Sequence, residues 1–178
     1  AELNDDFSVK VRSKGTKKWE NAPSYLVKVA NVTDAGNVQE KSSVCYFDFL
    51  GEVEVSVTYN KGNIETAKIR PLSYGINSEI NENTLTFTLN RPCNLSVEVN
   101  DNIFQNLQLF ANPVKEFTFN KKDPDLIYFG PGLHKLDHGE LHVTTGKTVY
   151  ISGGAVLMGR LNVENAENVK ISGSGITA

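Results

Sequence analysis

The chain has 178 residues, of which 39% are hydrophobic, and its formal net charge is −3 at pH 7. This length allows one large or two small folded domains with a substantial core. The charge is spread thinly, whereas a nucleic-acid-binding protein more often carries a concentrated basic stripe, and no apolar run approaches the roughly 20 residues of a membrane span. We therefore expect neither nucleic acid nor membrane as a partner, and Ala1 is consistent with the first residue of a processed chain.

The first two-thirds of the chain predicts short β-strands. Apolar and polar residues alternate there, as they do on a strand with one buried face. The alternating segments are 25–29, 52–59, 84–90, 95–99 and 107–109. They recur about every 10 residues with Asn and Gly turns between them, and no segment keeps a helical apolar period for more than a turn. This pattern predicts an antiparallel β-sandwich with a wet outer face.

The alternating apolar pattern of the sequence changes after Asn112-Pro113. Phe117 and Phe119 form one short alternating piece, which we interpret as a connector, and the segment 121–124 breaks the pattern again. Short apolar strands separated by glycine corners begin at Leu126. We therefore predict two parts: a β-sandwich domain over residues 1–113, and a connector followed by a second all-β part over residues 114–178.

The second part contains an internal repeat, because residues 139–156 align with residues 159–176 without a gap at an offset of 20. The identical pairs are Gly139/Gly159, Leu141/Leu161, Val143/Val163, Val149/Val169, Ile151/Ile171, Ser152/Ser172 and Gly153/Gly173. Repeats of this length built from short strands indicate a solenoid. Neither copy has the Leu-x-x-Leu-x-Leu run of leucine-rich repeats, so the repeat predicts the first coils of a parallel β-helix.

The final predicted coil lacks a covering element. Each coil of a β-helix exposes backbone N–H and C=O groups that a further coil or a cap must satisfy, and about three repeats are usually needed for stability. The second copy ends at Ile176 without an amphipathic cap. We therefore expect this chain to be the N-terminal portion of a longer protein. The alternative is that a second copy covers the open end, which would be self-association.

The cysteines and histidines give weak signals. Cys45 and Cys93 are too far apart in sequence for a zinc knuckle, and we interpret them as half-buried free thiols on strands. His134, His138 and His142 have a spacing that would suit zinc on a helix. In a strand such residues lie about 13 Å apart, so we expect surface histidines beside a turn.

Two further patterns have structural and functional interpretations. Gly130-Pro131-Gly132 and Gly153-Gly154 precede no helix, so corner turns are favoured over phosphate loops. A pyranose ring packs well on an exposed aromatic ring. The aromatic residues that could offer such a platform are Trp19, Tyr25, Tyr46, Phe47 and Phe49. Core packing is the commoner use of aromatic residues in a sandwich, and Trp19, in a polar stretch, is the member expected to be exposed.

Several stretches resemble a known enzyme family. The segments DLIYFGPGLHKL (125–136), GKTVYISGGAV (146–156) and NVKISGSGI (168–176) resemble the opening coils of polygalacturonase-like glycoside hydrolases of family 28, which are right-handed parallel β-helices. The upstream segments 69–76, 95–100 and 107–113 look like the β-sandwich that precedes the helix in some members. The related dextranase and isopullulanase family has a similar two-part layout.

This resemblance implies a secreted or periplasmic polysaccharide-degrading hydrolase, with a pectin-like or other glycan as the partner of the whole enzyme. Its chemistry is inverting hydrolysis by two carboxyl groups across a cleft. The family signatures Asn-x-Asp, Asp-Asp, Gly-His-Gly and Arg-x-Lys lie on later coils. Short matches here stand in the wrong context: Asp5-Asp6, Arg12-Ser13-Lys14 and Asp137-His138-Gly139. We therefore assign no catalytic, cofactor-binding or metal-binding residue and no cofactor, and expect this chain by itself to be inactive.

Two other functions remain open from the sequence. One is a carbohydrate-binding or adhesion module with no hydrolytic activity. The other is part of a β-helical polysaccharide lyase, in which calcium-binding carboxylates and a basic residue would follow downstream.

Overall fold

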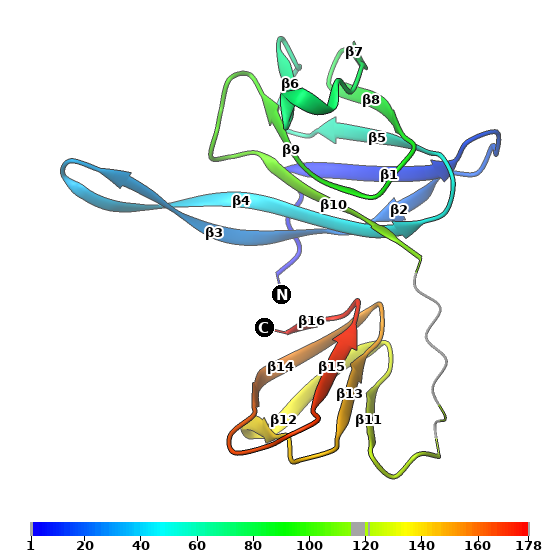
Figure 1. Cartoon of the computed structure of the whole chain (residues 1–178). Coiled ribbons are helices and arrows are strands. Elements are labelled where there is room, and N and C mark those ends of the chain that lie inside the picture. Colours follow the sequence, from blue (N-terminus) through cyan, green and yellow to red (C-terminus); the bar gives the residue numbers. More distant parts are fainter. Residues whose placement is uncertain (1, 115–119, 121, 178) are drawn as a thin grey trace. The chain divides into compact units, whose positions relative to one another are not determined.

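The structure, a computed structural model, describes residues 2–114, 120 and 122–177. It is all-β, and its described residues include a single short 3-10 helix, η1 (Leu72–Tyr74). The all-β prediction is therefore confirmed. The chain divides into two compact units, Glu2–Lys115 and Glu116–Ala178 (Figure 1). The predicted connector strand at Phe117 and Phe119 lies outside the described residues.

The larger unit consists of two five-stranded sheets. The first has the order β2-β1-β5-β8-β7, and each neighbouring pair is antiparallel. Its strands are β1 (Phe7–Ser13), β2 (Glu20–Ala22), β5 (Val53–Tyr59), β7 (Ser78–Asn81) and β8 (Thr84–Leu89). The second has the order β3-β4-β10-β9-β6. Its strands are β3 (Ser24–Thr33), β4 (Gly36–Phe49), β6 (Ala67–Arg70), β9 (Cys93–Val99) and β10 (Leu107–Pro113).

One apolar core joins these two sheets. Alternate residues of each strand point into it, as the sequence pattern predicts: Val55 and Val57 from the first sheet and Val97, Leu107 and Leu109 from the second are fully buried. The residues between them face outward. On the first sheet these are mostly polar, among them Arg12, Glu54 and Thr88, whereas the outer face of the second sheet also carries Tyr46 and Phe110.

The prediction of a wholly antiparallel sandwich is wrong at one pair. β4 and β10 run parallel, with Leu107 opposite Ser43 and Pro113 opposite Phe49. Strands so far apart in sequence need no hairpin between them, so either direction can be built. Inward and outward residues alternate identically in both cases, and the sequence pattern therefore cannot distinguish them.

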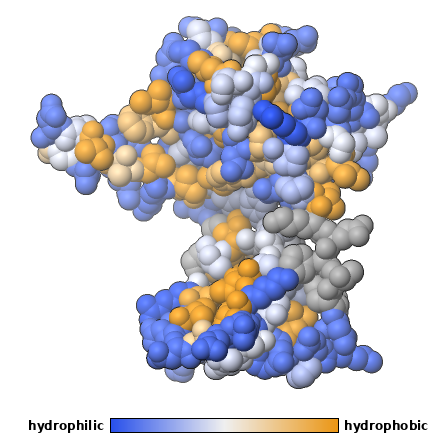
Figure 2. All heavy atoms as spheres, in the orientation of Figure 1, coloured by the Kyte–Doolittle hydropathy of each residue, from blue (hydrophilic) through white to orange (hydrophobic). Residues whose placement is uncertain are grey.

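The hairpin of β3 and β4 extends well beyond the sandwich. The two strands pair from Ser24–Cys45 to Thr33–Gly36, whereas β10 pairs with β4 only from Ser43 onward. The outer part is a two-stranded ribbon (Figure 1). Apolar side chains remain exposed on it (Figure 2), among them Val32.

The smaller unit has two three-stranded parallel sheets, and the chain alternates between them. One sheet contains β11 (Leu126–Phe129), β13 (Thr148–Ile151) and β15 (Lys170–Gly173). The other contains β12 (Gly132–His142), β14 (Ala155–Asn162) and β16 (Ile176–Thr177). Val149, Ala155 and Leu157 are fully buried between them. Each passage through both sheets adds one strand to each, which is the winding of stacked coils.

The gapless repeat alignment is right for one sheet and wrong for the other. Leu141 pairs with Leu161 and Val156 with Ile176, both at the predicted offset of 20. Val149, however, pairs with Ile171 rather than Val169, and Ile151 pairs with Gly173. The second coil contains two extra residues between β14 and β15 and two fewer between β15 and β16, and these changes cancel over the whole repeat.

Candidate functional site

A polar groove lies on the outer face of the first sheet of the larger unit. Its volume is about 650 Å³. Strands β1, β5, β7 and β8 contribute to it, together with η1 and the segment joining β1 to β2. The lining residues used below are Arg12, Trp19, Glu54, Tyr74, Glu79 and Thr88.

The strand register aligns three floor residues across the sheet. Arg12 stands opposite Glu54, and Glu54 stands opposite Thr88. Arg12 Nε donates to Glu54 Oε2 at 2.7 Å and Arg12 Nη2 to Oε1 at 3.1 Å, so the two planar groups meet edge to edge. This hydrogen bonding lowers the pKa of Glu54 and raises the pKa of Arg12. The carboxylate is therefore ionised and fixed in orientation.

Two aromatic rings line the same groove, and a guanidinium contacts each of them. Arg12 Cζ lies 4.4 Å from the centroid of Trp19, and Arg91 Cζ lies 4.9 Å from the centroid of Tyr74. These are cation–π distances, which hold each ring in place. Tyr74 is 41% exposed, and Trp19 is half-buried. η1 presents Tyr74 because the chain turns at Gly75, whose φ of 61° suits glycine.

The ionised side chains of the lining are mostly acidic. Glu52, Glu54 and Glu79 face the groove together with Arg12. Lys14 pairs with Glu52, and the hydrogen bond that Lys14 donates to the Glu52 carboxylate raises the pKa of Lys14. The groove thus combines exposed aromatic surface, fixed charged hydrogen-bonding groups and the hydroxyl of Thr88. Such a surface can bind a hydroxyl-rich ligand.

The remaining members of the predicted aromatic platform lie elsewhere. Phe47 and Phe49 belong to the core. Tyr25 and Tyr46 stack at 6.1 Å between ring centroids on the outer face of the second sheet. Burial raises the pKa of Tyr46 to about 12. Trp19 is half-buried rather than freely exposed, because its ring packs on Arg12.

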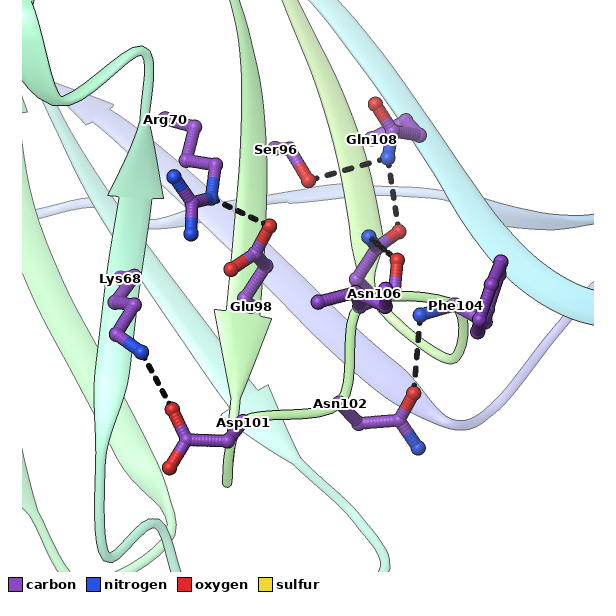
Figure 3. A network of polar contacts seen from close by, with 10 residues as sticks. Lys68, Arg70, Ser96, Glu98, Asp101, Asn102, Phe104, Asn106 and Gln108 are labelled. Carbon is purple, nitrogen blue, oxygen red and sulfur yellow. Dashed lines mark hydrogen bonds and ion pairs between the residues drawn. The ribbon is translucent and has the colours of Figure 1, made fainter.

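A second polar cluster lies on strands β6, β9 and β10 (Figure 3). Lys68 Nζ contacts Asp101 Oδ1 at 2.6 Å, and Arg70 Nε donates to Glu98 Oε1 at 2.7 Å. The Lys68 ammonium lowers the pKa of Asp101 by hydrogen bonding. Every charge in this cluster is paired with an opposite charge, so its role is to connect neighbouring strands.

The three histidines have separate surroundings. His134 Nε2 lies 2.6 Å from the carbonyl oxygen of Gly130, and its ring packs edge-on against Phe129. His138 has a φ of 54°, at the irregularity within β12. His142 Nε2 lies 3.2 Å from Glu140 Oε1. Over the described part of the chain, no cluster of three His, Cys, Asp or Glu residues could hold a metal ion.

Glu140 is the centre of a small polar cluster on the smaller unit. Arg160 Nε donates to its Oε2 at 2.7 Å and Asn162 Nδ2 to its Oε1 at 2.6 Å. These hydrogen bonds lower the pKa of Glu140. The cluster joins β12 to β14, where Glu140 pairs directly with Arg160.

The other short motifs are structural in their contacts. Asp6 pairs with Lys61 at 2.7 Å, and the Asp5 carbonyl accepts a hydrogen bond from Asn60. The two glycine corners lie one above the other, because the Gly132 N–H donates to the Gly154 carbonyl at 3.0 Å. Both cysteines are free, as expected. Cys93 is half-buried as predicted, but Cys45 is fully buried in the core because it lies at an inward position of β4, and burial raises its pKa to about 12.

The sequence did not predict this groove. Arg12, Glu54 and Thr88 come from three strands far apart in the chain and meet only through the sheet register. One signal was available: Arg12 and Glu54 are charged residues at outward positions of alternating strands.

Comparisons with known proteins place the fold. No known sequence family and no curated protein matches the chain in sequence. Among solved structures, Dex49A from Penicillium minioluteum is similar with a TM-score of 0.72 and 17% sequence identity over 99% of this chain. The chain spans 46% of the length of Dex49A. The two proteins therefore share a fold over essentially all of this chain. Among the described residues, no helix is long and apolar enough to cross a membrane.

Proposed function

We propose that this chain is the N-terminal, non-catalytic portion of a polysaccharide-degrading glycoside hydrolase whose catalytic part is a right-handed parallel β-helix. The observation that carries the proposal is the similarity to Dex49A, a dextranase, over 99% of this chain but less than half of that enzyme. In this view the two parallel sheets are the opening coils. A β-helix offers a long surface that suits an extended polymer, although fold alone does not fix function.

The resemblance to family 28 and the structural similarity point to related enzymes with different substrates. Both support the proposal of a β-helical hydrolase preceded by a sandwich. The structural similarity favours the dextranase branch over the polygalacturonase branch. A neutral glucan is therefore the first substrate to test, with pectin as the alternative. We further propose that the protein is secreted or periplasmic, since its substrate would be an external polymer.

The contacts of the acidic side chains support a non-catalytic role for this portion. Inverting hydrolases keep two carboxyl groups roughly 6.5–9.5 Å apart, with one of them retaining its proton. In the groove Glu54 accepts two hydrogen bonds from Arg12, and its pKa is lowered. Glu140 is held in the same way by Arg160 and Asn162. Neither carboxyl group suits a general acid, because its proton is lost more readily than usual.

The experiment measures reducing ends released from dextran, pullulan and polygalacturonate by the longer parent protein and by this chain alone. We expect release by the parent on at least one polymer, with inversion at the anomeric carbon seen by NMR, and none by this chain. Unsaturated products would instead establish a lyase. Binding by the parent without any cleavage would establish an adhesion module, and either result would overturn the proposal.

A further inference from the structure

We propose that the groove lined by Trp19, Arg12, Glu54, Thr88 and Tyr74 binds a segment of a neutral polysaccharide. This site goes beyond the proposed function, because it lies on the sandwich and a protein without hydrolytic activity could also use it. The aromatic rings of the groove suit one face of a sugar. A pyranose ring presents C–H groups on one face, and these pack on an aromatic ring. Tyr74 and Trp19 both offer ring surface to this groove.

The polar floor of the groove suits the hydroxyl groups of a sugar. A sugar carries adjacent hydroxyl groups, each of which can donate and accept hydrogen bonds. The carboxylate of Glu54 accepts and the guanidinium of Arg12 donates, and their mutual hydrogen bonds at 2.7 and 3.1 Å fix both groups before a ligand arrives. The exposed Thr88 adds a hydroxyl group on the next strand. Preorganised groups of this kind lower the ordering cost of binding.

The charges select the class of polysaccharide. Three lining residues are carboxylates: Glu52, Glu54 and Glu79. Arg12 pairs with Glu54 and Lys14 pairs with Glu52, so Glu79 is the lining carboxylate that forms no ion pair among the described residues. A polymer of galacturonate would bring one more negative charge on each sugar, and these charges would be repelled by the carboxylates of the groove. An uncharged polymer has hydroxyl groups for the same partners without this repulsion. The ligand class is therefore a neutral glycan, and acidic glycans are disfavoured.

Native gel electrophoresis in dextran, pullulan or polygalacturonate tests this site with the chain as it is. We expect a neutral polymer to retard the chain and polygalacturonate to have no effect. Trp19→Ala should raise the dissociation constant derived from the retardation about tenfold, the equivalent of about 1.4 kcal/mol of binding free energy. Thr88→Tyr should abolish it by filling the groove while keeping a residue that favours strands.

Two controls separate this site from general effects. Tyr25→Ala removes an aromatic ring from the outer face of the other sheet, and Gln39→Tyr adds a ring at an exposed position of the β3–β4 hairpin. Both should bind as the wild type does, and thermal unfolding checks that each variant is folded. The proposal is overturned by three results: no retardation on neutral polymers, stronger retardation on polygalacturonate, or retardation that neither groove variant weakens. None of these affects hydrolysis by the parent, so the two proposals fail separately.

Discussion

Asn106 illustrates how this protein stabilises a buried polar side chain. It is 4% exposed. Ser42 Oγ donates to the Asn106 Oδ1 atom at 2.9 Å. Gln108 Nε2 donates to the same atom at 2.8 Å (Figure 3). Asn106 Nδ2 donates to the Ile103 carbonyl at 2.6 Å. The amide is therefore satisfied on both sides, and it ties β4 to β10 and to the loop before β10.

Removing this amide should be costly. Asn106→Ala removes the side-chain hydrogen bonds to Ser42, Gln108 and Ile103, and a hydrogen bond typically contributes about 0.5–1.5 kcal/mol to stability. We expect the free energy of unfolding, measured in urea, to fall by about 2 kcal/mol. Asn102→Ala is the matched control, because Asn102 accepts its hydrogen bonds from Phe104 and Gln105 on the exposed surface. An equal loss in both variants would contradict this role for burial.

Cys45 makes stability depend on pH at high pH. Burial raises its pKa from 9.0 to about 12 in the folded chain. The unfolded chain therefore loses this proton first, and stability that is complete below pH 9 declines as pH rises toward 12. Each pH unit in this window should cost about 1.4 kcal/mol. Urea unfolding from pH 8 to 11 should show this slope in the wild type and a shallower one in Cys45→Ala. Identical slopes would contradict the prediction.

Single residues also show the limit of sequence reasoning here. The burial of Val55, Val97 and Leu109 could be predicted from the alternation of apolar and polar residues along each strand. The pairing of Arg12 with Glu54 does not, since it depends on which strands become neighbours and in which register. Residues whose role comes from burial were predictable. Those whose role comes from a partner on another strand were not.

Among the strands, the smaller unit shows how a repeat can mislead. The two copies keep an overall period of 20, yet β13 and β15 pair at an offset of 22. Insertions at corners are tolerated because they lie outside the sheets, and a gapless alignment cannot reveal two changes that compensate each other. The predicted strands themselves are present. Only the pairing within the sheet of β11, β13 and β15 could not be predicted from the repeat.

Glycine is required where coils approach closely. At Gly159, φ is +133° and an added Cβ would lie 2.7 Å from the Gly139 carbonyl oxygen. At Gly132, φ is +123° but nothing lies within 4 Å of such an atom. Gly132→Ala therefore introduces backbone strain alone, about 1 kcal/mol. Gly159→Ala adds a clash with backbone and should cost about 3 kcal/mol.

Hydrogen–deuterium exchange of the β13 and β14 amides measures this difference. Exchange in Gly159→Ala should be faster than in Gly132→Ala, which should be faster than in the wild type. If both variants exchange at the same rate, the close approach of the two coils is not a constraint.

On the scale of the whole molecule, the chain has two separate apolar cores. The larger extends from Phe7 to Ala111, whereas the smaller contains Val143, Val149, Ile151, Ala155 and Leu157 as its buried members. The all-β class and the existence of two parts could be predicted, because both depend on local patterns. Strand order could not, since many orders satisfy the same alternation.

The separate cores predict that the sandwich folds without the rest of the chain. Residues 2–114 alone should unfold in urea in one cooperative transition. Trp19, the single tryptophan, reports on this unit by fluorescence. We expect the free energy of unfolding of the larger unit to agree within about 0.5 kcal/mol between this fragment and the whole chain. A fragment without a cooperative transition would show that the larger unit depends on the smaller one.

We propose that the smaller unit is the beginning of a longer stack of coils. Among the described strands, β15 and β16 each pair on one side only. An experimental structure of the longer parent protein is the most direct test. This proposal predicts new strands that pair in parallel with β15 and with β16, and acidic residues gathered on later coils. It would be contradicted by a parent in which these two edges stay unpaired, or in which an antiparallel strand or a helix covers them.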